Sequence, residues 1–171
     1  IFCPSLGHDK IISLNSIFSF TTSQRKGLFM SQAKNAQCHC GAVKFTVMLS
    51  DEFNTIRRCT CSFCRMRGAV AVSAPLSGIH VFEGQDKLTE YRFNTGQAVH
   101  YFCSVCGIYT FHQRRSIPEQ FGVNVACIQG ISPFDFTHVP VMDGVHHPKD
   151  GGGGLVGHLD FSAIKKTHEP L

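Results

Sequence analysis

The sequence has no long apolar run, and this excludes a membrane-spanning helix. No window approaches the roughly 18 unbroken apolar residues that such a helix needs, although 43% of the 171 residues are hydrophobic. A secretory signal is missing as well, because the apolar stretch at 11–20 is interrupted by polar residues and has no small-residue cleavage pattern. We therefore expect a soluble, cytoplasmic protein in a reducing compartment, with no membrane partner.

The chain also has little surplus charge. Its 16 Lys and Arg residues exceed its 12 Asp and Glu residues by four. Residues 1–29 hold three of the basic side chains and one of the acidic ones, so the remainder has 13 basic and 11 acidic side chains, a balance of +2. No basic stripe is interleaved with aromatic residues. Nucleic acid is therefore not expected as a partner.

A long 3.6-residue period is absent too, which argues against long helices. Residues 43–49 instead alternate apolar and polar side chains, as a half-buried strand does. Stretches of the same style lie at 68–74, 78–84, 88–94, 98–103, 107–113 and 120–128, and residues 155–161 fit a last edge strand. The fold class predicted is mainly β, with little helix.

The first part of the chain differs from the rest. Residues 1–29 begin at Ile1 and are rich in Ser, Phe and Ile without a clear period. We expect residues 1–33 to be a disordered extension that is non-native before Met30, with a transit peptide as the alternative because acidic residues are scarce. The folded domain is then expected over 34–161, with a flexible glycine-rich break at 149–154 and a polar tail at 162–171.

Cysteine carries the strongest signal. Seven of the nine cysteines form three tight groups, CHC at 38–40, CTCSFC at 59–64 and CSVC at 103–106. Thiolates one or two residues apart can point at one ion, because a tight turn brings the sulfurs to the roughly 3.7 Å separation that Zn–S bonds near 2.3 Å imply. Joining Cys38 and Cys40 to Cys103 and Cys106 gives one closed, four-sulfur zinc site.

Other uses of these cysteines fit less well. A disulfide framework favours an even cysteine count and a signal peptide. A redox CxxC at Cys103 and Cys106 belongs in a βαβ context that the sequence does not show. We expect Cys127 to be a buried core thiol on a strand, and Cys3 to be incidental.

The middle group supplies only three sulfurs, from Cys59, Cys61 and Cys64. Three protein ligands with a vacant fourth position are typical of a catalytic zinc, and the vacancy accepts water or a substrate thiol. A fourth protein ligand could instead close the site. The candidates for it are His39, His80, His100, His112, His146, His147 and Cys127. A third possibility, besides an open and a closed zinc site, is that this group binds no metal.

The order of these motifs resembles the glutathione-dependent formaldehyde-activating enzyme and centromere protein V family. The motifs are CHCGAVKF (38–45), CTCSFCRMRGA (59–69), YFCSVCGIYTF (101–111) and MDGVHHP (142–148). The resemblance covers about residues 36–160. It implies an Mss4-like β-tent of antiparallel sheets clamped by zinc. It also implies two Zn²⁺ ions, a structural one at Cys38, Cys40, Cys103 and Cys106 and a catalytic one at Cys59, Cys61 and Cys64.

The resemblance further implies a carbon–sulfur lyase with glutathione as its thiol substrate and formaldehyde or a related aldehyde as the second substrate. Arginine forks match the carboxylates of glutathione. The candidates are Arg58, Arg65, Arg67, Arg114 and Arg115, of which Arg65 is favoured because its neighbour Cys64 would be held by metal. His146 and His147 are expected to line the site or to stabilise a turn.

Two other classes of function remain open at this point. A zinc-stabilised binding module of the centromere protein V type would need no chemistry, but it usually carries a long basic or Pro-rich extension that is not visible here. A redox or metal-buffering protein would show labile cysteines and no thiol substrate. The sequence does not indicate an oligomeric state.

Overall fold

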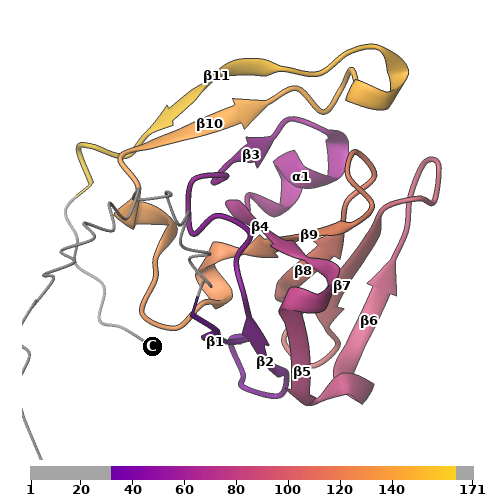
Figure 1. Ribbon diagram of the computed structural model, residues 1–171, viewed down its shortest axis with the longest axis vertical. Coiled ribbons are helices and arrows are strands. Elements are labelled where there is room, and N and C mark those ends of the chain that lie inside the picture. The colour runs from indigo at the N-terminus through magenta and orange to yellow at the C-terminus, as the bar shows by residue number, and fades with distance from the viewer. Residues whose placement is uncertain (1–31, 165–171) are drawn as a thin grey trace, which may run out of the picture.

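The computed structural model describes residues 32–164, which fold into three β-sheets (Figure 1). Nearly all of the expected extension at 1–33 lies outside the described residues, and so does most of the expected tail at 162–171. The possible transit peptide and the assignment of Met30 as the native start lie outside them too.

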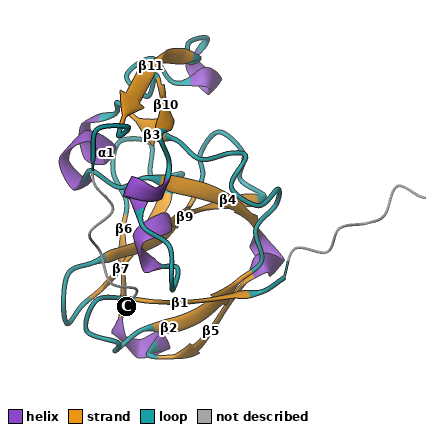
Figure 2. Cartoon of the chain, turned by 90° about the vertical axis from the view of Figure 1, so that its left-hand side faces the viewer, coloured by secondary structure: helices purple, strands orange, loops and turns teal. Residues whose placement is uncertain are grey.

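A five-stranded antiparallel sheet forms the centre of the molecule, in the order β4-β9-β8-β7-β6. Its strands are β4 (Ala71–Pro75), β6 (Leu88–Tyr91), β7 (Val99–Cys103), β8 (Tyr109–Gln113) and β9 (Gln120–Asn124). A second antiparallel sheet contains β1 (Lys34–Gln37), β2 (Lys44–Val47) and β5 (Ile79–Glu83) in the order β1-β2-β5. It lies below the central sheet in Figure 2.

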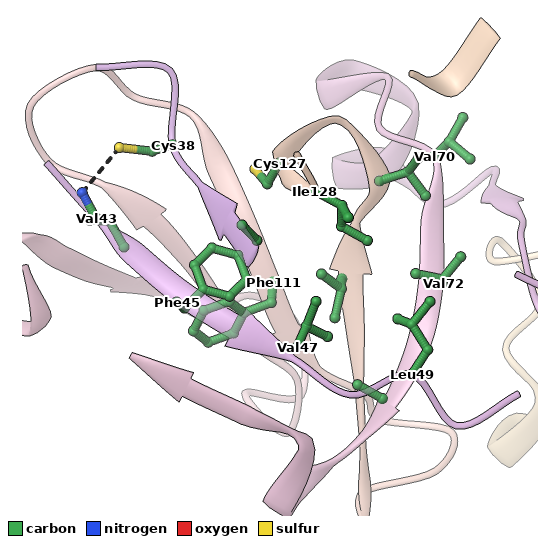
Figure 3. Close-up of a cluster of buried hydrophobic side chains, with 14 of the residues drawn as sticks. Cys38, Val43, Phe45, Val47, Leu49, Val70, Val72, Phe111, Cys127 and Ile128 are labelled. Atoms are coloured by element: carbon green, nitrogen blue, oxygen red, sulfur yellow. Dashed lines mark hydrogen bonds between the residues drawn. The ribbon is translucent and has the colours of Figure 1, made fainter. Parts of the chain in front are cut away.

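The core lies between these two sheets. The alternation seen at 43–49 buries Val43, Phe45, Val47 and Leu49, each at most 3% exposed. Phe45 meets Phe111 of the central sheet edge to face, with ring centroids 5.3 Å apart (Figure 3). Burying one such side chain contributes roughly 1.5–3 kcal/mol. These contacts hold β2 against β8.

A third sheet joins distant parts of the chain. It consists of β3 (Arg58–Cys59), β10 (His138–Met142) and β11 (Leu155–Asp160), in the order β11-β10-β3. β10 pairs antiparallel with β11, the predicted edge strand, but parallel with β3, where Met142 lies opposite Cys59. In Figure 1, β10 and β11 run across the top of the molecule, above β3. We call residues 138–160 the C-terminal arm.

Helix is scarce, as predicted. The only α-helix of the described residues is α1 (Ser62–Arg67). Five 3₁₀ turns accompany it, at Leu76–Gly78, Gln85–Lys87, Val125–Cys127, Pro133–Asp135 and Pro148–Asp150. The described part of the chain contains no helix long and apolar enough to cross a membrane. The prediction of a mainly β, largely antiparallel fold is confirmed.

Cys127 is buried, at 3% exposed, but the expectation that it lies on a strand is wrong. β9 ends at Asn124, whose side chain accepts a hydrogen bond from the Ala126 amide at 3.2 Å and starts a 3₁₀ turn. An Asn side chain that bonds the backbone two residues ahead competes with the strand ladder. This local competition ends the predicted strand early.

Candidate metal centres and active-site cavity

The first sulfur cluster joins two turns that are far apart in sequence. Cys38 and Cys40 lie in the turn that follows β1, whereas Cys103 ends β7 and Cys106 lies in the turn after it. All four sulfurs lie within 4.8 Å of one another. The Cys38–Cys40 and Cys40–Cys103 sulfur distances are 3.6 and 3.8 Å. These distances match the edges of a tetrahedron with Zn–S bonds of about 2.3 Å.

Backbone geometry makes both turns possible. Gly41 and Gly107 have φ angles of +73° and +74°, a region that favours glycine because it carries no Cβ. The Val43 amide donates to the Cys38 sulfur at 3.2 Å (Figure 3). Amide donors of this kind stabilise a thiolate. Because burial raises the pKa of Cys38 to about 12, a cation is needed for it to lose its proton near neutral pH.

The second cluster is built around the start of α1. Cys59 ends β3, Cys61 caps the helix N-terminus, and Cys64 lies buried in the helix. The three sulfurs lie within 4.8 Å of one another, and no fourth His, Cys, Asp or Glu ligand atom of residues 32–164 joins this group. The Cys61 and Cys64 amides each donate to the preceding cysteine sulfur at 3.4 Å. The local chain therefore holds the sulfurs in one small volume.

Proximity alone does not ionise all three thiols. Hydrogen bonds from Cys59 and Cys64 lower the pKa of Cys61 to about 2. The hydrogen bond from Cys61 raises the pKa of Cys59, and bonds from both neighbours raise the pKa of Cys64. A cation among the sulfurs removes this conflict, because it favours the thiolate form of each. The donor set fits a thiophilic ion such as Zn²⁺.

A cavity of about 450 Å³ opens beside the second cluster. Its wall contains Cys59, Cys61 and Cys64, and five arginines also line it. These arginines are Arg57, Arg58, Arg67, Arg114 and Arg115. Arg65 lies elsewhere, in a shallower groove that it shares with Arg58 and Cys59. The structure thus gathers four of the five arginines singled out in the sequence around one cavity and adds Arg57 to them.

Two of these arginines share a single acceptor. Arg57 and Arg114 both donate to the Ser73 hydroxyl, at 3.1 and 3.3 Å. Burial, followed by the nearby Arg114 charge, lowers the pKa of Arg57 to about 10, and burial also lowers the pKa of Arg114. Within residues 32–164 neither guanidinium forms an ion pair with a carboxylate, whereas Arg115 forms a two-bond pair with Asp150 at 2.8 and 2.5 Å. Two adjacent, half-buried cations favour an anionic ligand.

Two stacked imidazoles and a tyrosine lie beside the cavity. His100 and His112 face each other across β7 and β8, with ring centroids 4.9 Å apart. The Tyr109 hydroxyl donates to the Gly122 carbonyl at 2.8 Å and accepts from His112 Nδ1 at 2.5 Å. Burial and the Arg67 charge lower the pKa of His100 to about 4, and the same two causes hold the pKa of His112 well below 6.5. Both rings are therefore neutral at neutral pH.

The MDGVHHP loop of the C-terminal arm closes the cavity over the sulfurs. A Cβ at Gly144 would lie 2.2 Å from the Cys59 sulfur, so only glycine fits there. The Asp143 carboxylate accepts from the Val145 and His146 amides and from His146 Nδ1, which stabilises the turn. His147 lines the cavity and accepts from the Lys149 amide. One histidine therefore stabilises a turn and the other also faces the cavity.

Several residues of this site gave no usable signal in the sequence. Arg57 precedes Cys59 by two positions. Only its bridge to Ala71 of β4, together with the pairing of β4 with β9 and of β9 with β8, brings it beside Arg114. Tyr109 lies in a strand pattern that suits any core aromatic. Of the histidines considered as a fourth ligand, His100, His112 and His147 line the cavity without joining the sulfur group.

The fold and the two sulfur clusters define a cysteine-rich β protein equipped to bind two metal ions. Residues 33–139 match the family model described as glutathione-dependent formaldehyde-activating enzyme, and the chain belongs to that family. The resemblance drawn from the motifs is thereby confirmed. The MDGVHHP loop lies beyond the matched residues.

The chain is also similar to a solved protein of Rhodobacter sphaeroides, a structural genomics target. The two share 53% sequence identity and superpose with a TM-score of 0.62. The match covers 63% of this chain and 98% of the other.

Proposed function

We propose that this protein is a zinc-dependent carbon–sulfur lyase that joins glutathione to formaldehyde or a related aldehyde. The observation that carries the proposal is the three-sulfur group of Cys59, Cys61 and Cys64 in the wall of a cavity lined by five arginines. The family match supports the same activity. The partners proposed are thus a small thiol and an aldehyde, in the cytoplasm.

The two clusters would have different tasks. Cys38, Cys40, Cys103 and Cys106 would hold a structural zinc, because their four sulfurs complete a tetrahedral set. Cys59, Cys61 and Cys64 would hold the catalytic zinc. When bound there, zinc supplies a fourth position that stabilises a substrate thiol as its nucleophilic thiolate at neutral pH.

The chain's own residues would bind and orient the substrate. Glutathione carries two carboxylates, and the guanidinium pair of Arg57 and Arg114 provides cationic donors for one of them. Arg65 remains the proposed contact for a more exposed part of glutathione, since its groove adjoins Cys59. The Gly144 loop would hold the substrate sulfur beside the cluster, because its backbone lies against Cys59 and Cys61.

In the reaction, the substrate sulfur loses its proton and forms a bond to the carbonyl carbon of the aldehyde. The carbonyl oxygen takes up a proton, and the product is S-hydroxymethylglutathione. The reverse reaction breaks the same carbon–sulfur bond, which defines a lyase. Positioning the two reactants in one cavity converts a bimolecular step into an effectively unimolecular one.

The test is to follow formation of S-hydroxymethylglutathione by NMR exchange spectroscopy with the zinc-loaded full chain. We expect the exchange rate to rise above the uncatalysed rate, and the matched Cys61→Ser variant to lose this acceleration while it stays folded. An exchange rate equal to the uncatalysed rate in buffer would disprove the proposed lyase activity. The zinc-stabilised binding module of the centromere protein V type would then be the better description.

A further inference from the structure

Arg67 lines the cavity, and its guanidinium points at the second cluster. It lies three residues after Cys64 in α1, so both side chains share one helix face. Its Nη2 donates to the Cys64 sulfur at 3.3 Å. Arg67 was considered above as a contact for a substrate carboxylate, but this bond gives its guanidinium a different partner.

The guanidinium is held in place from two other sides. Its Nη1 lies 3.1 Å from His100 Nδ1, which accepts because arginine has no acceptor atom. Its carbon lies 3.6 Å from the centroid of the Tyr109 ring, a cation–π contact. Both partners are buried, with His100 3% and Tyr109 8% exposed. The direction of the Arg67 fork is therefore set by the central sheet.

Arg67 is a half-buried cation. Its Nε is buried without a hydrogen-bond partner, and within residues 32–164 it forms no ion pair with a carboxylate. A buried charge needs a compensating one. The sulfur of Cys64, once it is a thiolate, is the anion in contact with it.

The charge of the centre shows what this cation does. Three thiolates and one Zn²⁺ sum to about −1, so a fourth thiolate would bring the centre to about −2. Adding the positive charge of the adjacent Arg67 guanidinium brings the summed charge back to about −1. A charged donor to a metal-bound thiolate also withdraws electron density from the sulfur, which leaves the metal a stronger acceptor for a new ligand.

We propose that Arg67 is the positioning residue that allows the centre of Cys59, Cys61 and Cys64 to accept a fourth, anionic sulfur. In this role Arg67 acts through Cys64. This inference rests on the proposed function, because it requires zinc at these three sulfurs and a thiol as substrate.

The experiment uses the full chain loaded with cobalt(II), whose visible bands report the ligands of a tetrahedral thiolate site. Wild type, Arg67→Gln, Arg67→Lys and the control Arg92→Gln are titrated with glutathione. The control removes one positive charge at an exposed arginine, Arg92, whose partners among residues 32–164 are Glu90 and the Gly96 carbonyl. Two bound cobalt ions and an unchanged circular dichroism spectrum establish that each variant is folded.

We expect Arg67→Gln to weaken glutathione binding by about 10- to 100-fold, the usual effect of losing an outer-shell partner. Arg67→Lys should recover part of the loss, because it keeps the charge without the fork. Before any thiol is added, Arg67→Gln should also shift the sulfur-to-cobalt charge-transfer bands to lower energy, since the Cys64 sulfur loses its donor. The control should match wild type in both measurements.

The outcomes separate the two proposals. Wild-type affinity in a folded Arg67→Gln variant, beside a wild type that responds to glutathione, would overturn the role of Arg67 alone. If the visible spectrum of the cobalt-loaded wild type does not change when glutathione is added, the proposed function is wrong. The proposed role of Arg67 in thiol binding is then wrong as well. Unshifted charge-transfer bands in Arg67→Gln would show that the guanidinium does not act on Cys64.

Discussion

At the scale of single residues, the geometry of the second cluster depends on a glycine and a histidine that lie close to its cysteines. Gly144 brings its backbone against Cys59, and its amide donates to the Thr60 hydroxyl at 3.0 Å. His100 presents a neutral acceptor to Arg67. Neither residue is a metal ligand, yet each restricts where the ligands can lie.

Gly144→Ala tests the close approach at Cys59. The added methyl group would lie 2.2 Å from the sulfur, so the sulfur or the loop must move. We expect the variant to stay folded but to bind the second metal ion at least about 10-fold more weakly. Metal stoichiometry after competition with a chelator measures this. Gly130→Ala is the control for backbone strain alone: its φ of +74° strains alanine, but the added Cβ meets nothing within 4 Å. An equal loss of metal there would contradict the prediction.

His100 should make the protein less stable in mild acid. Burial and Arg67 hold the pKa of this ring at about 4, whereas the unfolded chain takes up the proton near 6.5. Between these two pH values only the unfolded state binds the proton. The contribution of neutral His100 to the stability of the folded protein is therefore complete above pH 6.5 and is lost as the pH falls toward 4. The loss is at most about 3 kcal/mol.

Urea unfolding at several pH values checks this dependence against His100→Gln. Glutamine keeps an acceptor for Arg67 but gains no proton, so its stability should fall less steeply from pH 6.5 to 4. Loss of metal in acid affects both proteins alike. Parallel slopes in the two proteins would disprove the contribution of His100.

At the scale of elements, α1 connects the metal ligands to the cavity. It begins at the Cys61 cap and ends at Gly68, whose φ of +70° is left-handed and whose amide donates to the Cys64 carbonyl at 3.1 Å. A glycine in this conformation ends a helix without a Cβ penalty. The cap therefore stops the helix directly after Arg67 and keeps Arg67 in its last turn.

Gly68→Ala should destabilise the fold by about 1 kcal/mol, because alanine is strained in the left-handed region. Gly68→Asn should cost less, since asparagine tolerates that region. Denaturant unfolding of the zinc-loaded variants measures both. Equal stability of the alanine variant and wild type would mean that the cap is unimportant for α1.

At the scale of the whole molecule, the two sulfur clusters connect different parts of the chain. The first joins the end of β1 to the end of β7, and so connects two sheets. The second lies within six consecutive residues and beside the C-terminal arm. Removing metal from the first centre should therefore affect the fold, and removing it from the second should affect only the site.

Cys38→Ser should unfold the chain, because a structural zinc contributes about 10 kcal/mol or more of binding free energy that becomes folding free energy. Cys61→Ser should remain folded and lose thiol binding. Circular dichroism and thermal unfolding distinguish the two variants. If Cys61→Ser unfolds as readily as Cys38→Ser, the assignment of one structural and one catalytic centre is wrong.

Much of the fold followed from local patterns. The period-two stretch at 43–49 and the strands after it were visible in sequence because each alternates or is bounded by turn residues. The short strands β3 and β10 were not, since a two-residue strand has no period and β10 contains Pro140. Their parallel pairing depends on contacts about 80 residues apart along the chain, which no local pattern reports.

The sequence by itself determined the chemistry of the two centres. Sulfurs one or two residues apart must lie within a few ångströms of each other, so the grouping of seven cysteines indicated metal binding before any fold was known. Only the tertiary structure decided what surrounds them. Strand pairings between distant segments bring Arg57 to Arg114 and Gly144 to Cys59, and side-chain packing of α1 against β7 brings Arg67 to His100. The covalent chain limits how far apart residues close in sequence can lie, whereas only the packing of the whole chain decides which residues distant in sequence come into contact.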